Sequence, residues 1–119
     1  DPGAIERIIT PETRAIIPVH LYGHPANMDK IIEIAKKHDL KIIEDCAHAI
    51  ETEANGRKAG TIGDFACFSF YVTKNVATGE GGMVLAKRKQ DMDRLKVLGL
   101  HGMSADAWKR WLELLGAAR

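Results

Sequence analysis

One lysine of this sequence stands between an apolar, strand-like run and a glycine-rich turn, a position suited to a reactive amine. The apolar run covers residues 68–72, Lys74 follows it, and three glycines lie within residues 79–82. Upstream, another apolar run ends in the carboxylates of Glu44 and Asp45. A lysine that forms a Schiff base and an acid that holds a pyridinium nitrogen are the two protein groups that pyridoxal 5'-phosphate (PLP) chemistry requires most.

Each of these groups also has an ordinary structural explanation. A lysine at the boundary between a strand and a loop is usually a solvated charge. An acid at a strand end can cap the following turn, which the small residues Cys46 and Ala47 would permit after Asp45. If the strand continues through both acids, Glu44 and Asp45 point to opposite faces, because side chains alternate along a strand.

The elements that must position these residues follow an α/β pattern. Short apolar runs bounded by turn residues cover residues 14–19, 41–44, 64–70 and 82–86, as expected for strands covered on both faces. Residues 27–38 have apolar side chains at helical spacing, with Asn27 as a suitable N-cap. This strand, helix, strand order predicts that the first two strands are parallel.

The second half of the chain has a different pattern. Residues 51–63 contain Asn55-Gly56 and two further glycines, which predicts a turn-rich excursion. The loop at residues 71–81 is too short for a helical crossover, so the last two strands should be antiparallel or lie apart. Residues 87–98 are predicted to be helical, with Met92, Leu95 and Leu98 on one face.

Several segments resemble, in order and at similar spacing, the DegT/StrS-type sugar aminotransferases, PLP enzymes of the aspartate-aminotransferase fold type. The matching segments are residues 1–6, 10–23, 42–49 and 68–82, followed by His101-Gly102 and residues 106–108. The resemblance covers nearly the whole chain. It implies that residues 1–119 are part of the PLP-transferase large domain, an α/β fold with a mixed, mostly parallel sheet flanked by helices. Because the chain starts on Asp1 and family members are longer, we expect an internal piece of a larger enzyme.

The resemblance also implies roles for four residues. Lys74 matches the family's Schiff-base lysine, and residues 69–75 agree with the family except at Val72, where proline is frequent. Ser69 matches the phosphate-binding serine, and Asp45 matches the aspartate on the pyridine nitrogen. His48 occupies a position where the family has glutamine or histidine near the phenolic oxygen of the cofactor. Ordinary structural roles stay open for Ser69 as a backbone-bonded serine and for His48.

One geometric condition follows for Ser69 and Lys74. Five residues in extended form span about 17 Å, which is longer than the cofactor. The segment between the two residues must therefore curl if both touch one PLP molecule.

The activity that the resemblance implies is PLP-dependent transamination of a keto-sugar, commonly nucleotide-linked, with an amino acid such as glutamate as donor. Such enzymes serve nucleotide-sugar metabolism and polysaccharide biosynthesis, and they are homodimers with a shared active site. A ring stacked on the cofactor and backbone donors for its phosphate are not found in this sequence. We therefore expect the isolated chain to be inactive.

Other candidate residues carry weaker signals. His20 lies at the end of a predicted strand, where α/β sheets bind ligands, but a hydrogen-bonded core histidine is the favoured interpretation. Gly79, Gly81 and Gly82 are predicted to adopt the positive φ values of a tight turn. His101 matches the family's His-Gly element and receives no role.

Composition excludes several classes of function. A formal net charge of +1 gives no basic field for nucleic acid. No apolar stretch approaches the roughly 20 residues of a membrane span. Cys46 and Cys67 lack the spacing of a zinc or redox site and, without a signal segment, fit reduced thiols of a cytoplasmic protein. We expect no metal.

Two rival interpretations remain. The chain could be a non-catalytic remnant or interaction module with the same fold. It could also be a receiver-type phosphorylation switch, but that architecture needs a phosphoacceptor aspartate at the end of an intervening strand. Asp64 instead lies at the start of its apolar run.

Overall fold

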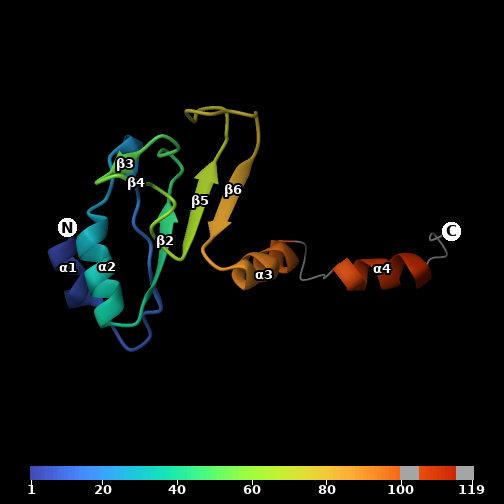
Figure 1. Cartoon of the computed structure of the whole chain (residues 1–119), viewed down its shortest axis with the longest axis horizontal. Helices are drawn as coiled ribbons and strands as arrows, with labels where there is room; N and C mark the ends of the chain where they lie inside the picture. The colour runs from blue at the N-terminus through green and yellow to red at the C-terminus, as the bar shows by residue number, and fades with distance from the viewer. Residues whose placement is uncertain (100–104, 115–119) are drawn as a thin grey trace. The chain divides into compact units, whose positions relative to one another are not determined.

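The computed structural model describes residues 1–99 and 105–114 of the 119-residue chain (Figure 1). It divides into two compact units, residues 1–87 and the residues from 88 onward. The first unit contains a four-stranded sheet in the order β1-β2-β5-β6. The strands are β1 (Ala15–Ile16), β2 (Lys41–Asp45), β5 (Phe65–Ser69) and β6 (Gly82–Ala86).

The sheet is mixed and mostly parallel, as predicted. β1 pairs with β2 and β2 with β5 in parallel, whereas β5 and β6 are antiparallel. The short loop between the last two strands therefore joins an antiparallel pair, which is one of the two arrangements left open by its length. Ser69, the last residue of β5, pairs with Gly82, the first residue of β6. The loop that carries Lys74 therefore connects these two neighbouring strand ends.

The predicted first helix is confirmed as α2 (Met28–Lys37). The Asn27 side chain accepts a hydrogen bond from the Lys30 N–H at 3.3 Å, which satisfies one free donor of the first turn. The buried face of α2 packs with two residues of the following strand segment into a hydrophobic core, formed by Met28, Ile31, Ala35, Leu40 and Ile42. Burial of this apolar stripe holds α2 against β1 and β2.

The apolar spacing does not predict the helix α1 (Pro2–Ile8) that lies beside α2 (Figure 1). None of its residues is buried, so no strong hydrophobic period marks it in the sequence. Its start is fixed locally, because the Asp1 side chain caps Gly3 at 2.9 Å and Pro2 occupies the first turn. Glu6 of α1 accepts hydrogen bonds from Lys37 and His38, each at 2.9 Å.

The first strand is shorter than the predicted residues 14–19. Pro18 has no N–H for the ladder, and regular pairing ends before it. Pairing resumes as an isolated parallel bridge between Val19 and Asp45. Asp45 N donates to Pro18 O at 2.9 Å and His20 N donates to Asp45 O at 3.1 Å. The end of β2 is thereby joined to the segment that carries His20.

Residues 51–63 form the predicted turn-rich excursion, with one small hairpin inside it. β3 (Glu53–Ala54) pairs in antiparallel fashion with β4 (Arg57–Lys58). Asn55 and Gly56 between them have φ values of 53° and 71°, as the two central residues of a type I′ turn require. Two-residue strands are too short to show an alternating pattern in the sequence.

The second unit contains α3 (Lys89–Gly99) and α4 (Ala105–Leu114). The predicted helix at residues 87–98 is confirmed as α3, although its apolar face is narrower than expected: Met92 and Leu95 are half-buried, but Leu98 is exposed. The sequence pattern did not indicate α4. Among the described residues, no helix has the length and apolar character needed to cross a membrane.

Candidate active site

The loop between β5 and β6 positions Lys74 by a tight turn. Lys74 N donates to Tyr71 O at 2.9 Å, and the base of the loop is closed by Phe70 N to Gly81 O at 2.8 Å. The segment between Ser69 and Lys74 is therefore curled, as the length of the cofactor required. The Lys74 side chain is half-buried.

The glycines of this loop act in two different ways. Gly79 and Gly81 have φ values of 83° and 152°, which confirms the prediction for these two positions. The prediction is wrong for Gly82, which is not among the residues with positive φ. A Cβ atom at Gly82 would instead lie 2.8 Å from Phe68 O, so glycine is needed there for close approach of β5 and β6.

The Lys74 amine meets an imidazole. Lys74 Nζ lies 2.9 Å from His48 Nε2, and His48 is supplied by the turn that follows β2. The other ring nitrogen, Nδ1, accepts a hydrogen bond from Tyr22 N at 3.4 Å. The Tyr22 and His48 rings are stacked, with centroids 5.3 Å apart and planes 3° from parallel. The structure thus brings together residues from three separate segments of the chain.

Asp45 ends β2 and is half-buried. Its Oδ1 accepts the Ala47 N–H at 3.0 Å, so the turn-capping role considered above is present. Within the described part of the chain, Oδ2 accepts no hydrogen bond from the protein. Asp45 makes no side-chain hydrogen bond there to Ser69, His48 or Lys74.

Ser69 ends β5, and its Oγ accepts the Tyr71 N–H at 3.4 Å. The backbone-bonded role left open for this serine is therefore present, but its O–H can still donate to a ligand. Ser69, His48 and Lys74 line one small hollow above the ends of β2 and β5. Asp45 does not line this hollow, although the next residue in the chain, Cys46, does.

Glu44 points into the protein, on the face of β2 opposite to Asp45 and away from this site, as strand alternation requires. It is fully buried and accepts four hydrogen bonds. Its donors are Ile62 N at 2.8 Å and Gly63 N at 2.6 Å on Oε1, and Gly60 N at 2.9 Å and His20 Nε2 at 3.1 Å on Oε2. Burial alone would raise the pKa of Glu44, but these donors outweigh it and hold the pKa below its ordinary value.

His20 is the hydrogen-bonded core histidine that the sequence favoured. It is 1% exposed, its Nε2 bonds Glu44, and its Nδ1 accepts Ala26 N at 3.1 Å. Because Nδ1 is an acceptor, the proton of the neutral ring is on Nε2 and points at the carboxylate. Both ring nitrogens are therefore occupied.

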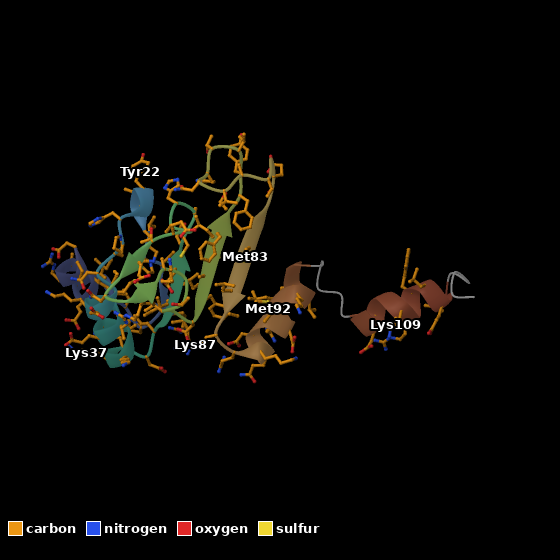
Figure 2. All side chains as sticks on the ribbon, turned by 45° about the horizontal axis from the view of Figure 1, so that its top comes forward. Tyr22, Lys37, Met83, Lys87, Met92 and Lys109 are labelled. Atoms are coloured by element: carbon orange, nitrogen blue, oxygen red, sulfur yellow. The ribbon has the colours of Figure 1, made fainter. Side chains whose placement is uncertain are left out.

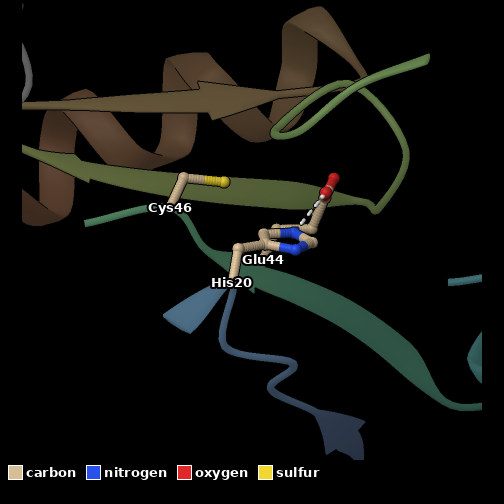
Figure 3. Close-up of side chains that lie close together, drawn as sticks. All are labelled: His20, Glu44 and Cys46. Carbon is tan, nitrogen blue, oxygen red and sulfur yellow. Dashed lines mark hydrogen bonds and ion pairs between the residues drawn. The ribbon is translucent and has the colours of Figure 1, made fainter. Parts of the chain in front are cut away.

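His20, Glu44 and Cys46 offer ligand atoms within 4.8 Å of one another (Figure 3). The chemistry of these donors does not suit a cation. The carboxylate and both imidazole nitrogens already have partners, and burial, with the charges of Glu44 and Asp45, raises the pKa of the Cys46 thiol to about 12. We regard the three residues as a packed polar core. Cys46 and Cys67 are both free thiols, in agreement with the sequence-based expectation.

The receiver-type alternative does not fit the geometry. Asp64 lies just before β5, at the opposite end of the sheet strands from Lys74, and its Oδ2 accepts the Ile42 N–H at 3.0 Å. His101, which matched the family without a role, lies outside the described residues.

A model of the DegT/DnrJ/EryC1/StrS aminotransferase family matches residues 1–118. The chain belongs to this family. As a DegT/DnrJ/EryC1/StrS member it is 48% identical over 111 residues to the spore coat polysaccharide biosynthesis protein SpsC of Bacillus subtilis, covering 93% of this chain and 28% of SpsC. It is 52% identical over 101 residues to a UDP-N-acetyl-3-dehydro-alpha-D-glucosamine 3-aminotransferase of Acidithiobacillus ferrooxidans. The match covers 84% of this chain and 27% of that enzyme.

The crystal structure of DesI with its TDP-sugar product superposes with a TM-score of 0.84 at 36% identity, over 89% of this chain and 27% of DesI. This likeness confirms the predicted fold class. The chain thus spans little more than a quarter of the length of these relatives. What the whole protein acts on is therefore a matter for proposal.

Two structural features near the site were not predicted. Tyr22 lies in the matching segment at residues 10–23, where nothing marked it as a site residue, yet it contacts both the face and one nitrogen of His48. Glu44 faces away from the site and joins His20 to the loop at residues 60–63. The nearest sequence signal for Tyr22 was the adjacent Gly23, which marks a turn.

Proposed function

We propose that this chain is part of the PLP-binding large domain of an aminotransferase. The whole enzyme would transfer an amino group from an amino acid such as glutamate to a keto-sugar carried on a nucleotide, as a cytoplasmic homodimer with a shared active site. The observation that carries the proposal is the contact of Lys74 Nζ with His48 Nε2 at the strand ends where Asp45 and Ser69 also lie. The isolated chain, on this view, has no activity.

The chemistry of the available groups fits PLP. An amine, a half-buried carboxylate with one unused oxygen, an imidazole and a hydroxyl all occur at the ends of β2 and β5. These are the groups that an aldehyde, a ring nitrogen, a phenolic oxygen and a phosphate would each engage. When bound, PLP supplies an electrophilic carbon and a ring that withdraws electrons from the amino acid.

The chain's own residues divide this work. Lys74 would hold the aldehyde of PLP through its side-chain amine and, when that amine is free, would take the proton of the donor Cα onto Nζ. Asp45 Oδ2 would accept a hydrogen bond from the ring nitrogen and offset its positive charge. His48 would position the phenolic oxygen, and the Ser69 hydroxyl would donate to the phosphate.

Two relatives support the sugar substrate. The name of the Acidithiobacillus enzyme specifies a UDP-linked sugar, and DesI was crystallised with a TDP-sugar product. Substrates that share a sugar on a nucleoside diphosphate make the same class the best proposal here. SpsC, whose name places it in polysaccharide biosynthesis, supports that setting for the product.

The test is covalent trapping in the whole enzyme. We expect borohydride reduction of the PLP-loaded protein, followed by peptide mapping, to place the pyridoxyl group on Lys74. Lys30 and Lys58 are internal controls, because both are exposed and in the same unit. Modification of either of them with an unmodified Lys74 would refute the assignment.

A second measurement separates Asp45 from its neighbour. Asp45→Asn should leave PLP bound but reduce kcat on the order of 10²-fold or more, because a neutral amide does not hold the ring nitrogen's charge. Turnover equal to wild type would exclude Asp45 from this role. If the whole protein bound no PLP at all, the non-catalytic alternative would be favoured instead.

A further inference from the structure

The turn between β3 and β4 combines two features that make an asparagine side chain reactive. Asn55 is followed directly by Gly56, and both residues are exposed. Glycine has no Cβ to shield its backbone nitrogen, and a Cβ built on Gly56 would meet nothing within 4 Å beyond its chain neighbours. In the described structure the Gly56 N–H donates no hydrogen bond. The Gly56 nitrogen is therefore free to approach the Asn55 side chain.

The other asparagines of the chain, Asn27 and Asn75, lack this combination. Asn27 is the N-cap of α2, and the nitrogen of the next residue, Met28, donates to Ala26 O at 2.7 Å. Asn75 is followed by Val76, whose branched Cβ crowds the backbone nitrogen. Attack of the following backbone nitrogen on the side-chain amide is therefore easiest at Asn55.

One carboxylate holds the Asn55 amide in place. Asn55 Nδ2 donates to Asp29 Oδ2 at 3.1 Å, and Arg57 pairs with Asp29 Oδ1. Asp29 belongs to the first turn of α2, and Figure 2 shows the hairpin ribbon beside this helix. The hydrogen bond from Asn55 to Asp29 engages the very nitrogen that must leave if the amide is attacked.

The backbone of the hairpin resists opening only weakly. β3 and β4 have two residues each, and a pairing this short opens at small cost. Ala59 N donates to Thr52 O at 2.9 Å, but this bond lies at the base of the hairpin, away from the turn. Among the described residues, Asp29 thus supplies the side-chain contact that restrains the turn itself.

We propose that Asn55 is a site of spontaneous deamidation and that its hydrogen bond to Asp29 limits the rate. The Gly56 nitrogen forms a bond to Asn55 Cγ, the Cγ–Nδ2 bond breaks, and Nδ2 leaves as ammonia with the proton released by Gly56 N. Water then opens the five-membered imide at either carbonyl, which leaves aspartate or isoaspartate. The formal net charge of the chain falls from +1 to 0. This inference is independent of the proposed function.

Peptide mapping by mass spectrometry, after incubation of the folded protein in mildly alkaline buffer, tests the site. We expect Asn55 to be converted while Asn27 and Asn75 keep their amides. The control is Gly56→Ala, whose Cβ has room but crowds the attacking nitrogen. Conversion should be slower by about 10-fold, which corresponds to a barrier higher by about 1.4 kcal/mol. Equal conversion at all three asparagines, or an intact Asn55, would overturn the proposal.

A second pair of variants tests the restraint. Asp29→Ala should speed conversion of Asn55 by about 2- to 5-fold, the factor that an exposed polar contact supplies. Glu33→Ala is the matched control, because Glu33 is an exposed acid of the same helix, and it should convert at the wild-type rate. Circular dichroism verifies that both variants are folded.

The same rates measured in denaturing urea separate the contact from the intrinsic reactivity of the Asn55-Gly56 pair. The wild type and Asp29→Ala should then convert equally fast, because the hydrogen bond exists only in the folded chain. Equal rates for these two proteins in the folded state, or a difference that persists in urea, would show that Asp29 does not restrain Asn55.

Discussion

Replacement of Glu44 by glutamine should destabilise the fold far more than any other charge-removing change at an acid of the first unit. The two residues have the same shape, but glutamine has one acceptor oxygen and one NH₂ donor. In Glu44 each carboxylate oxygen accepts two hydrogen bonds: Ile62 N and Gly63 N on Oε1, and Gly60 N and His20 Nε2 on Oε2. Either orientation of the amide therefore places NH₂ against two donors.

The magnitude follows from these four bonds. Glu44 is 0% exposed, so water does not replace a lost partner. A hydrogen bond to a charged group contributes about 1.5–3 kcal/mol, so the loss of two costs about 3–6 kcal/mol. His20 cannot adapt by moving its proton, because its Nδ1 accepts Ala26 N. The expected loss is a large part of the roughly 5–15 kcal/mol that stabilises an ordinary domain.

Urea unfolding followed by circular dichroism measures this change in the free energy of unfolding. The matched control is Glu51→Gln, because the Glu51 side chain is 83% exposed and pairs only with Lys58 at 3.8 Å in the described structure. Its unfolding free energy should stay within about 0.5 kcal/mol of wild type. A loss below about 1 kcal/mol for Glu44→Gln would show that the buried bonds do not stabilise the fold as argued.

The same carboxylate makes stability depend on acid. Burial tends to raise the pKa of Glu44, but its hydrogen-bond donors hold it below the ordinary value in the folded chain. Its contribution is therefore complete above the unfolded pKa of about 4.3 and is lost as pH falls through the folded pKa. The unfolding free energy of wild type should thus fall more steeply with decreasing pH below about 4 than that of Glu44→Gln. Parallel pH profiles would contradict this reasoning.

Two further predictions concern packing and thiol chemistry. Gly60→Ala should lower the unfolding free energy by about 1–3 kcal/mol more than Gly56→Ala. Both glycines have positive φ, but only a Cβ at Gly60 would overlap the buried Phe68 ring. Equal losses for the two variants in urea unfolding would refute the overlap. In the native chain at neutral pH, a thiol reagent should modify the exposed Cys67 and leave Cys46 unmodified until unfolding, because Cys46 is buried and its pKa is raised to about 12; mass spectrometry showing equal native rates would contradict this.

Local signals predicted those parts of the fold whose cause is local. α2 was predicted because its cap at Asn27 and its apolar spacing lie within one short segment. The length of the loop that carries Lys74 excluded a parallel crossover and left antiparallel pairing or separated strands, and β5 and β6 form the antiparallel pair. By contrast, α1 buries none of its residues, so nothing in its pattern marked it as a packed helix.

The candidate site shows the same division. Lys74 and Asp45 could be selected from their strand-end positions and their flanking motifs. The contacts of His48 with Tyr22 and Lys74 each join residues 26 positions apart, and no spacing rule foresees them. The bonds of Glu44 to the loop at residues 60–63 use backbone N–H groups, which every residue except proline possesses, so they leave no signature in the sequence.

Side chains alternate between the two faces of β2, so its last two residues should be under different selection. Position 44 should be selected for folding and position 45 for activity. Glu44 points into the protein and bonds the backbone, whereas Asp45 points to the strand end beside the proposed cofactor site. In a library of all substitutions, changes at position 44 should reduce the amount of soluble, folded protein recovered from cells. Changes at position 45 should leave that yield nearly unchanged and reduce only the activity per molecule.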